Sequence, residues 1–291
     1  MAAPSALLLL LAVTAHTTVA VQGSRSLLQA AAAGPVSAVA QLPLPLAKVH
    51  SHNDYDQPRP LFAALEAGIC SIEADPWLIN GTFYIAHEAN VIKKNLTIQS
   101  LYLHPLSQIV KANGGYVYPA SKYSGVCSSI ILLVDFKSTA YFLPNGTGAA
   151  NNATNSTGAD MWDLFEPLLA SYQNQVPGLF TTYNANGTKV PGAITVLISG
   201  TRPDPAYVAN KPVRYSALDG RLVNLDNAWG PEDRIIRFWN TPDTPDAWEF
   251  FYATGEDLVN TDLLQPTKTF TLAKLAGSKS AVAGVPGVQT A

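Results

Sequence analysis

Ionisable side chains stand two residues apart at the carboxyl ends of several apolar runs in this chain. Three such pairs occur: His50 with His52, Glu73 with Asp75, and Asp135 with Lys137. A spacing of two puts both members of a pair on the same face of a β-strand. His87 ends a fourth apolar run, after Phe83-Tyr84-Ile85-Ala86. We therefore expect all of these residues to meet at one edge of a sheet.

The three carboxylates in this set predict a divalent metal site. Glu73, Asp75 and Asp135 gathered at one place would repel one another and raise one another's pKa unless a cation held them ionised. Oxygen ligands without a thiolate suit Mg²⁺ or Ca²⁺ better than zinc. Lys137 could offset part of the negative charge or hold a phosphate oxygen of a substrate.

The histidines add acid–base chemistry to this site. Imidazole titrates near neutral pH, so two histidines beside a metal can act as general base and general acid in a displacement at phosphorus. We assign these roles to His52 and His87, with His50 as the alternative to His52 because it faces the same way. Each residue taken alone has a structural interpretation, since strand-end carboxylates often cap helices or form ion pairs, and a lone histidine such as His104 is more often structural.

An amidohydrolase-type metal hydrolase is the alternative chemistry, because that class also opens its barrel with a His-x-His pair. Such a site needs further histidines late in the chain, whereas the last histidine here is His104. Covalent serine catalysis is poorly supported, because the sequence contains no G-x-S-x-G motif. Glycine-rich phosphate loops of the Walker or dinucleotide type are also missing.

Continuous apolar runs predict the buried parallel strands that would carry these residues. Eight runs qualify: 47–51, 71–75, 83–87, 130–136, 193–199, 222–225, 235–239 and 257–260. Residues 60–68 and 160–170, which lie between them, have helical periodicity. Strands separated by helices imply a parallel α/β sheet, and eight strands favour a TIM-type (β/α)8 barrel, regular or irregular, with the paired residues at its catalytic mouth.

The ends of the chain differ in composition from its middle. Residues 1–20 have the apolar run and small-residue exit of a secretory signal peptide, and residues 21–42 read as a flexible leader. One barrel domain is expected over 43–266, with a polar insertion at 143–155 and a low-complexity tail over 267–291. Six N-x-[ST] sequons agree with a secretory route: Asn80, Asn95, Asn145, Asn152, Asn155 and Asn186. These features predict a secreted or lumenal monomer without a stable membrane anchor.

Charge and cysteine content restrict the partners and leave one question open. A formal net charge of −3 gives no basic footprint for nucleic acid. A phosphate-bearing substrate would therefore have to be captured locally, by a metal or a few cations. Cys70 and Cys127 are the only cysteines. They could form a disulfide in an oxidising compartment or remain buried thiols, and the sequence does not decide between the two.

The stretch from His50 to Glu88, HSHNDYDQPRPLFAALEAGICSIEADPWLINGTFYIAHE, resembles the opening of the phospholipase C-like phosphodiesterase superfamily. That superfamily includes glycerophosphodiester phosphodiesterases and sphingomyelinase D toxins. The nearest branch is the group named after altered inheritance of mitochondria protein 6. Later segments fit the same branch: LYLHPL (101–106), ILLVDFKS (131–138), TVLISGTRP (195–203), LDGRLVNL (218–225) and GEDLVNTDLL (255–264).

This resemblance implies a barrel enzyme that hydrolyses phosphoric diesters with the help of a metal. The family places a catalytic His at the end of the first strand, Glu and Asp at the second, another His at the third and an acidic metal ligand at the fourth. The matching positions here are His52 or His50, Glu73, Asp75, His87 and Asp135. The His-Arg-Gly and Glu-Asn-Thr motifs of the glycerophosphodiesterases are absent. Their glycerol-specific contacts are therefore not implied.

The implied substrate is a small-molecule or lipid phosphodiester, such as a glycerophosphodiester, a lysophospholipid or sphingomyelin. Arg202, Trp229 and Trp239 are candidates to line its pocket, with Arg202 and Trp239 joining Lys137 as substrate-binding residues. A function of a different class is a catalytically inactive secreted barrel that only binds a ligand. Turnover of a synthetic phosphodiester would separate these two functions.

Overall fold

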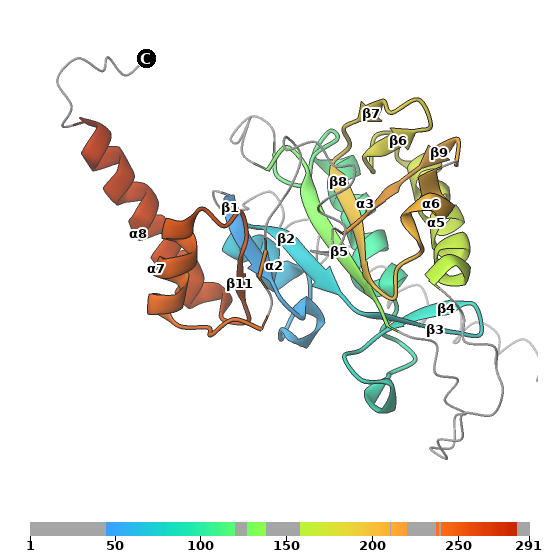
Figure 1. Ribbon diagram of the computed structural model, residues 1–291, viewed down its shortest axis with the longest axis horizontal. Helices are drawn as coiled ribbons and strands as arrows, with labels where there is room; N and C mark the ends of the chain where they lie inside the picture. Colours follow the sequence, from blue (N-terminus) through green and yellow to red (C-terminus); the bar gives the residue numbers. More distant parts are fainter. Residues whose placement is uncertain are drawn as a thin grey trace, which may run out of the picture. The chain divides into compact units, whose positions relative to one another are not determined.

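A sheet of six parallel strands lies at the centre of the fold, in the order β10-β8-β5-β2-β1-β11 (Figure 1). Its strands are β1 (Leu46–Ser51), β2 (Ile69–Ala74), β5 (Ile130–Phe136), β8 (Ile194–Gly200), β10 (Ser216–Leu218) and β11 (Val259–Thr261). All neighbouring pairs are parallel, so the carboxyl ends of the strands share one edge. The structure is a computed structural model that describes residues 45–119, 127–137, 158–209, 211–219, 237–238 and 240–283.

The middle of this sheet is buried on both faces. All six residues of β2 are buried, which is typical of a strand in a covered parallel sheet. Helix α5 (Gly158–Gln175) packs by the ring of Phe165, whose centroid lies 5.5 Å from that of Phe136 and 5.3 Å from that of Phe83. Both contacts are edge-to-face, the geometry that aromatic pairs favour. This aromatic cluster packs against the last residue of β5, next to Asp135.

The predicted parallel α/β sheet is present, and five of the eight predicted strands overlap β1, β2, β5, β8 and β11. Strand β10 was not expected, because three residues are too few for a recognisable apolar run. The predicted strand at 222–225 and most of the one at 235–239 lie outside the described residues. Closure into a (β/α)8 barrel therefore stays a prediction. The predicted signal peptide, leader and 143–155 insertion also lie outside the described residues, and the domain limits remain predictions.

The expectation of a parallel strand over 83–87 is wrong. Strand β4 (Thr82–Ile85) instead pairs antiparallel with β3 (Pro76–Ile79) in a separate two-stranded sheet. The connecting residues Asn80 and Gly81 have φ values of 49° and 76°. Positive φ at both central residues is the signature of a tight hairpin turn, for which Asn-Gly is the favoured sequence. The Asn80-Gly81 pair is therefore a turn signal, although Asn80 was predicted only as a sequon.

The remaining described elements flank the central sheet. The predicted helices at 60–68 and 160–170 appear as α2 (Phe62–Ala67) and the longer α5. The other helices are α3 (His104–Ala112), α6 (Pro205–Ala209), α7 (Pro245–Thr254) and α8 (Leu264–Ala283). Short helical turns are η1 (Asp54–Asp56), η2 (Ala89–Val91) and η3 (Gln99–Leu103). A three-stranded antiparallel sheet has the order β7 (Lys189–Val190), β6 (Thr182–Asn184) and β9 (Val213–Arg214).

Helix α8 occupies much of the region expected to be a low-complexity tail, so the boundary expected at residue 266 falls inside it. Thr267 and Thr271 are buried, and the Thr267 hydroxyl lies 2.8 Å from that of Thr261 at the end of β11. The Lys268 ammonium donates to the carbonyl of Glu66. Small hydroxyl residues spaced four apart thus supply the packing face, which composition alone does not reveal. Within the described ranges, no helix has the length and apolar character that a membrane span requires.

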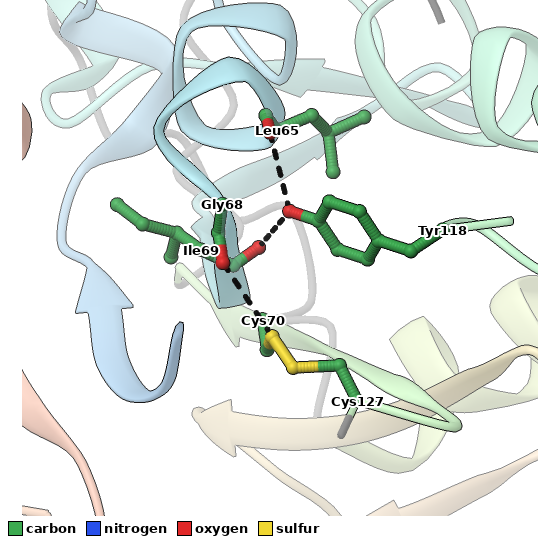
Figure 2. The surroundings of a disulfide bond; sticks show 6 residues. All are labelled: Leu65, Gly68, Ile69, Cys70, Tyr118 and Cys127. Carbon is green, nitrogen blue, oxygen red and sulfur yellow. Dashed lines mark hydrogen bonds between the residues drawn. A yellow bond between two sulfur atoms is a disulfide. The ribbon is translucent and has the colours of Figure 1, made fainter. Parts of the chain in front are cut away.

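Cys70 and Cys127 form a disulfide, which resolves the alternative that the sequence left open (Figure 2). Their Cα atoms are 5.9 Å apart, close to the most common separation for bonded cysteines. Cys70 lies in the buried strand β2. The hydroxyl of Tyr118 donates to the carbonyl of Ile69 at 2.8 Å, next to the disulfide (Figure 2). The segment after α3 is thereby attached to the strand that ends at the acidic residues.

Candidate functional site

The register of the sheet places the acidic residues at its carboxyl edge. Strands β2 and β5 pair Glu73 with Leu133 and Ala74 with Val134, so Asp75 and Asp135 follow at equivalent positions on neighbouring strands. Glu73 and Asp75 are buried and Asp135 is partly exposed. One carboxylate oxygen from each of the three acids lies within 4.8 Å of the others. The structure therefore brings together all three predicted metal ligands.

Lys137 lies against two of these acids. Its ammonium is 2.7 Å from Oδ2 of Asp135 and 2.9 Å from Oδ2 of Asp75. The other oxygen of Asp75, Oδ1, is buried and has no hydrogen-bond partner in the described part of the chain. Burial raises the pKa of Asp75 to about 6, the charge of Lys137 opposes the shift, and the charge of Glu73 adds to it. The charge of Lys137 therefore does not outweigh the burial of Asp75.

The three carboxylates fit a divalent cation that prefers oxygen ligands. An unpartnered buried carboxylate oxygen costs free energy unless it finds a partner. A cation bound to Oδ1 of Asp75 would provide that partner and would also reduce the repulsion among the three acids. No cysteine or histidine nitrogen belongs to the described cluster, which is the donor set of Mg²⁺ or Ca²⁺ rather than of a thiolate-bound metal.

His50 is enclosed behind the acids. Its Nδ1 lies 2.7 Å from the hydroxyl of Ser71 and its Nε2 lies 3.1 Å from Oε2 of Glu73. The side chain is only 1% exposed. Burial and the charge of Arg237 lower the pKa of His50 to about 4, although Glu73 opposes the shift. With both nitrogens engaged, this ring is placed to orient Glu73.

His52 lies at the rim, between β1 and β11. Its backbone N–H donates to the carbonyl of Thr261, and its Nδ1 is 2.9 Å from Oδ1 of Asp262. The side chain is 27% exposed. A small cavity of about 100 Å³ opens beside it, lined by His52, Asn240, Thr241, Asp243, Asn260, Thr261 and Asp262. Of the two predicted first-strand histidines, His50 therefore contacts an acid of the cluster directly, whereas His52 pairs with Asp262 at the end of β11.

His87 reaches the site from the β3–β4 hairpin. The backbone N–H of Ala86 donates to the carbonyl of Asp75, which fixes the chain just before His87. Nδ1 of His87 is 3.3 Å from the hydroxyl of Tyr55 and 3.4 Å from Oδ2 of Asp75. The side chain is 54% exposed. His87 is thus beside the acids although the strand before it belongs to the antiparallel hairpin and not to the parallel sheet.

Several residues that contact the acids or His52 were not predicted from the sequence. Tyr55, in the turn after β1, donates to Oδ2 of Asp75 at 2.6 Å. Arg237 donates to Oδ1 of Asn260 at 2.8 Å and lies 3.6 Å from Oε2 of Glu73. Asp262 pairs with His52, as described above. Of these, Asp262 had a recognisable signal, because it follows an expected strand in the same way as the predicted acids.

The buried carboxylate of Asp54 stabilises the loop that carries His52 and Tyr55. Asp54 accepts hydrogen bonds from the Ser51 hydroxyl at 2.9 Å, from the Leu61 backbone N–H at 2.6 Å and from the Tyr102 hydroxyl at 3.0 Å. It is fully buried. Burial raises the pKa of Asp54 to about 6, although these three donors oppose the shift.

Of the remaining predicted substrate residues, Arg202 lies in the described part of the chain. Arg202 follows β8 at the same edge of the sheet and is partly buried, with its backbone close against Gly158. Trp229 and Trp239 lie outside the described residues. The assignments of Lys137, Arg202 and Trp239 to substrate binding stay predictions, as do the catalytic and metal-binding roles.

Comparison with known proteins supports the family resemblance. Residues 42–143 match the model of the AIM6-like phosphodiesterase domain. The chain is 37% identical to altered inheritance of mitochondria protein 6 of Saccharomyces cerevisiae, over 65% of this chain and 49% of the relative. It is 31% identical to a homolog from Arthroderma benhamiae, over 63% of this chain and 55% of the relative, and 32% identical to a protein from Lachancea thermotolerans, over 62% and 42%. The predicted resemblance is confirmed.

Two further findings limit what these relatives imply. The chain spans about half the length of the curated relatives it matches. No solved structure matches the chain.

The predicted secretion is contradicted, because the relatives are named for altered inheritance of mitochondria and thus point to a mitochondrial association. Three-residue sequons arise readily by chance, so their number does not establish a secretory route.

Proposed function

We propose that this chain, which is similar over residues 42–143 to the AIM6-like phosphodiesterase domain, is a metal-dependent phosphoric diester hydrolase. The observation that carries the proposal is the meeting of three carboxylates and the accessible His87 at the carboxyl edge of the parallel sheet, where the partly exposed His52 also follows β1. This edge is where α/β proteins place their active sites. The substrate is a glycerophosphodiester, a phospholipid or a similar diester, and nucleic acid is not a partner.

Glu73, Asp75 and Asp135 would hold Mg²⁺ or Ca²⁺ in this enzyme. When bound, the ion would supply charge stabilisation for the phosphoryl oxygen. Lys137, which contacts Asp75 and Asp135, would hold a second phosphate oxygen. Arg237 offers a further cation on the side of Glu73. Arg202 remains a candidate at the end of β8.

His52 and His87 act as general base and general acid in this proposal. Asp262 binds Nδ1 of His52, which leaves Nε2 to accept a proton from the attacking hydroxyl. His87 gives a proton to the leaving oxygen as the phosphorus–oxygen bond breaks. His50 is better suited to orienting Glu73 than to proton transfer, because its ring is buried and both of its nitrogens are hydrogen-bonded.

The cellular setting proposed for this activity follows from the relatives. Their names refer to the inheritance of mitochondria, and we take a mitochondrial association as the working location. A monomer is expected, because nothing in the described site requires a second chain. Density-gradient fractionation with mitochondrial markers would test the location independently of the activity.

Turnover of bis(p-nitrophenyl) phosphate by the purified chain tests the enzymatic proposal. We expect activity with Mg²⁺ or Ca²⁺, reversible loss in EDTA, and loss in Glu73→Gln, because the amide removes one charged ligand. Glu249→Gln is the matched control, since Glu249 lies on α7 and pairs with Lys274 at the surface. Full turnover of metal-stripped protein in EDTA would refute the metal requirement. Calorimetric metal binding without turnover of any diester would instead support the catalytically inactive binding protein.

A further inference from the structure

The hydroxyl of Tyr55 lies between a proposed metal ligand and a proposed general acid. It is 2.6 Å from Oδ2 of Asp75, 2.7 Å from Oδ1 of Asn53 and 3.3 Å from Nδ1 of His87. The Tyr55 side chain is almost completely buried at 8% exposure. A buried phenol in contact with three polar groups at the edge of a candidate active site calls for a specific role.

The number of hydrogens available determines the direction of these hydrogen bonds. A tyrosine hydroxyl has one hydrogen to donate and lone pairs that accept. Both Oδ1 of Asn53 and Oδ2 of Asp75 can accept this hydrogen, and an ionised carboxylate is a stronger acceptor than an amide oxygen, so the hydrogen goes to Asp75, in agreement with the shorter distance. The oxygen of Tyr55 is then left to accept, and Nδ1 of His87 is the ring nitrogen within reach. Burial and the charge of Asp75 raise the pKa of Tyr55, so the hydroxyl stays protonated.

We propose that Tyr55 is a positioning residue that keeps a proton on Nδ1 of His87, so that proton transfer to and from substrate occurs through Nε2. The Nδ1–H of His87 donates to the Tyr55 hydroxyl, which donates to Asp75. This role rests on the proposed phosphodiesterase function, in which His87 is the acid. Nδ1 of His87 makes a hydrogen bond with the Tyr55 hydroxyl at 3.3 Å, whereas its 3.4 Å contact with Oδ2 of Asp75 is an ion-pair distance without a hydrogen bond, so Tyr55 connects the two.

Proton accounting supports this arrangement. The protonated ring of His87 carries hydrogens on both nitrogens. When the phosphorus–oxygen bond breaks, the Nε2 proton goes to the leaving oxygen and the bond electrons stay on that oxygen. The ring is then neutral and keeps its hydrogen on Nδ1, the form that Tyr55 accepts. A ring with its only hydrogen on Nε2 would instead leave the Tyr55 oxygen without a donor from His87.

Nitrogen NMR of the histidine rings measures this tautomer directly. Spectra would be recorded at about pH 8.5, where an ordinary imidazole with a pKa of about 6.5 is neutral. His87 signals are identified by their absence in His87→Ala, and the chain has only five histidines. We expect the Nδ1–H form in the wild type and in Tyr116→Phe, a control at an exposed tyrosine. In Tyr55→Phe we expect a mixture that includes the Nε2–H form.

Kinetics provides the second measurement. At saturating metal, Tyr55→Phe should lower kcat about 10- to 100-fold, the range for residues that orient a ligand or catalytic group, with KM nearly unchanged. An unchanged tautomer together with wild-type kcat would overturn the role of Tyr55. If the wild-type protein hydrolyses no diester, the proposed function fails, but the NMR comparison still decides whether Tyr55 sets the tautomer. The two failures are therefore distinguishable.

Discussion

At the scale of single residues, the partner of each histidine determines what its ring can do. Both nitrogens of His50 are engaged, by Ser71 and Glu73, in a fully buried position. His52 and His87 each use Nδ1 for a protein contact and are partly exposed. Within the described residues, no hydrogen bond involves Nε2 of either ring. Of these three histidines, His52 and His87 therefore suit the proton transfers proposed above better than His50 does.

Substitution of the three histidines should separate catalytic from structural effects. His52→Ala and His87→Ala should each lower kcat by about two orders of magnitude or more, the range for one general acid or base, without changing the unfolding free energy much. His50→Ala should destabilise the fold, because it leaves buried Ser71 and Glu73 without their partner. Steady-state kinetics and urea unfolding measure the two effects. A stable His50→Ala protein with the largest loss of turnover would reverse the assignment of His50 and His52.

Asp54 predicts a pH-dependent contribution to stability. Its pKa in the folded protein, about 6, lies above the ordinary value of 3.8, so the folded state favours the protonated form. The stability from Asp54 is full below the unfolded pKa and is lost as the pH rises through 6. A shift of this size corresponds to at most about 3 kcal/mol.

Urea unfolding of the wild type and Asp54→Asn between pH 4 and 7 tests this sign. The unfolding free energy of the wild type minus that of the variant should fall as the pH rises. Asp56→Asn, at an exposed position two residues away, should show no such trend. A difference that grows with pH would mean that the three donors to Asp54 outweigh the effect of burial.

The candidate site could be predicted only where strand geometry determines position. Glu73, Asp75 and Asp135 meet as expected, because the period of two and the parallel register both follow from local sequence. Tyr55 and Arg237 could not be found in the same way. Their side chains reach the site from irregular segments, whose path depends on long-range contacts such as those of Asp54.

At the scale of elements, the turn residues determine the direction of a strand that the apolar pattern alone predicts wrongly. The apolar run at 83–87 has the composition of a buried strand, but Asn80-Gly81 reverses the chain just before it. The resulting hairpin still brings His87 close to the acids. The backbone N–H of Ala86 donates to the carbonyl of Asp75, and the backbone N–H of Lys137 donates to the carbonyl of Pro76. A different element thus reaches the predicted location.

Gly200 at the end of β8 makes room for Asp135. Its φ is 64°, and a Cβ added there would overlap Oδ1 of Asp135 and the carbonyl oxygen of Phe136. Gly200→Ala should therefore cost about 1–2 kcal/mol from the positive φ, plus about 1–3 kcal/mol from overpacking, and should weaken metal binding by displacing Asp135. Urea unfolding and calorimetric metal titration measure the two effects.

Gly187→Ala is the matched control for Gly200→Ala. Gly187 has a φ of 82° but no atom within 4 Å of an added Cβ, so it carries the backbone strain without the overlap. We expect it to be less destabilising than Gly200→Ala and to bind metal normally. Equal losses of stability and equal metal affinities in the two variants would show that Asp135 does not depend on Gly200.

At the scale of the whole molecule, the sequence predicted the parallel sheet but not the cross-link that ties it to the following segment. Buried parallel strands can be recognised in the sequence as apolar runs, whereas the sequence does not show how close two cysteines lie in the folded protein. The disulfide joins the central strand β2 to Cys127, three residues before the neighbouring strand β5. The covalent loop that it closes therefore contains most of β2, the β3–β4 hairpin and α3.

This loop predicts a large effect on stability and a small one on the site. The bonded cysteines are 57 residues apart in sequence, and closing a loop of that length removes enough chain entropy to stabilise the fold by about 4 kcal/mol in the polymer model. Cys127→Ala should lower the unfolding free energy by up to that amount. Wild-type protein with its disulfide reduced should unfold at nearly the same urea concentration as the variant, because both lack the cross-link.

The reduced wild type also distinguishes loop entropy from local packing. If Cys127→Ala is destabilised but reduction of the wild type has no effect, the loss comes from the side chain and not from the cross-link. Metal affinity should be retained in both proteins, since Glu73, Asp75 and Asp135 are positioned by the register of β2 with β5 rather than by the disulfide. Loss of metal binding on reduction alone would instead mean that the cross-link maintains that register.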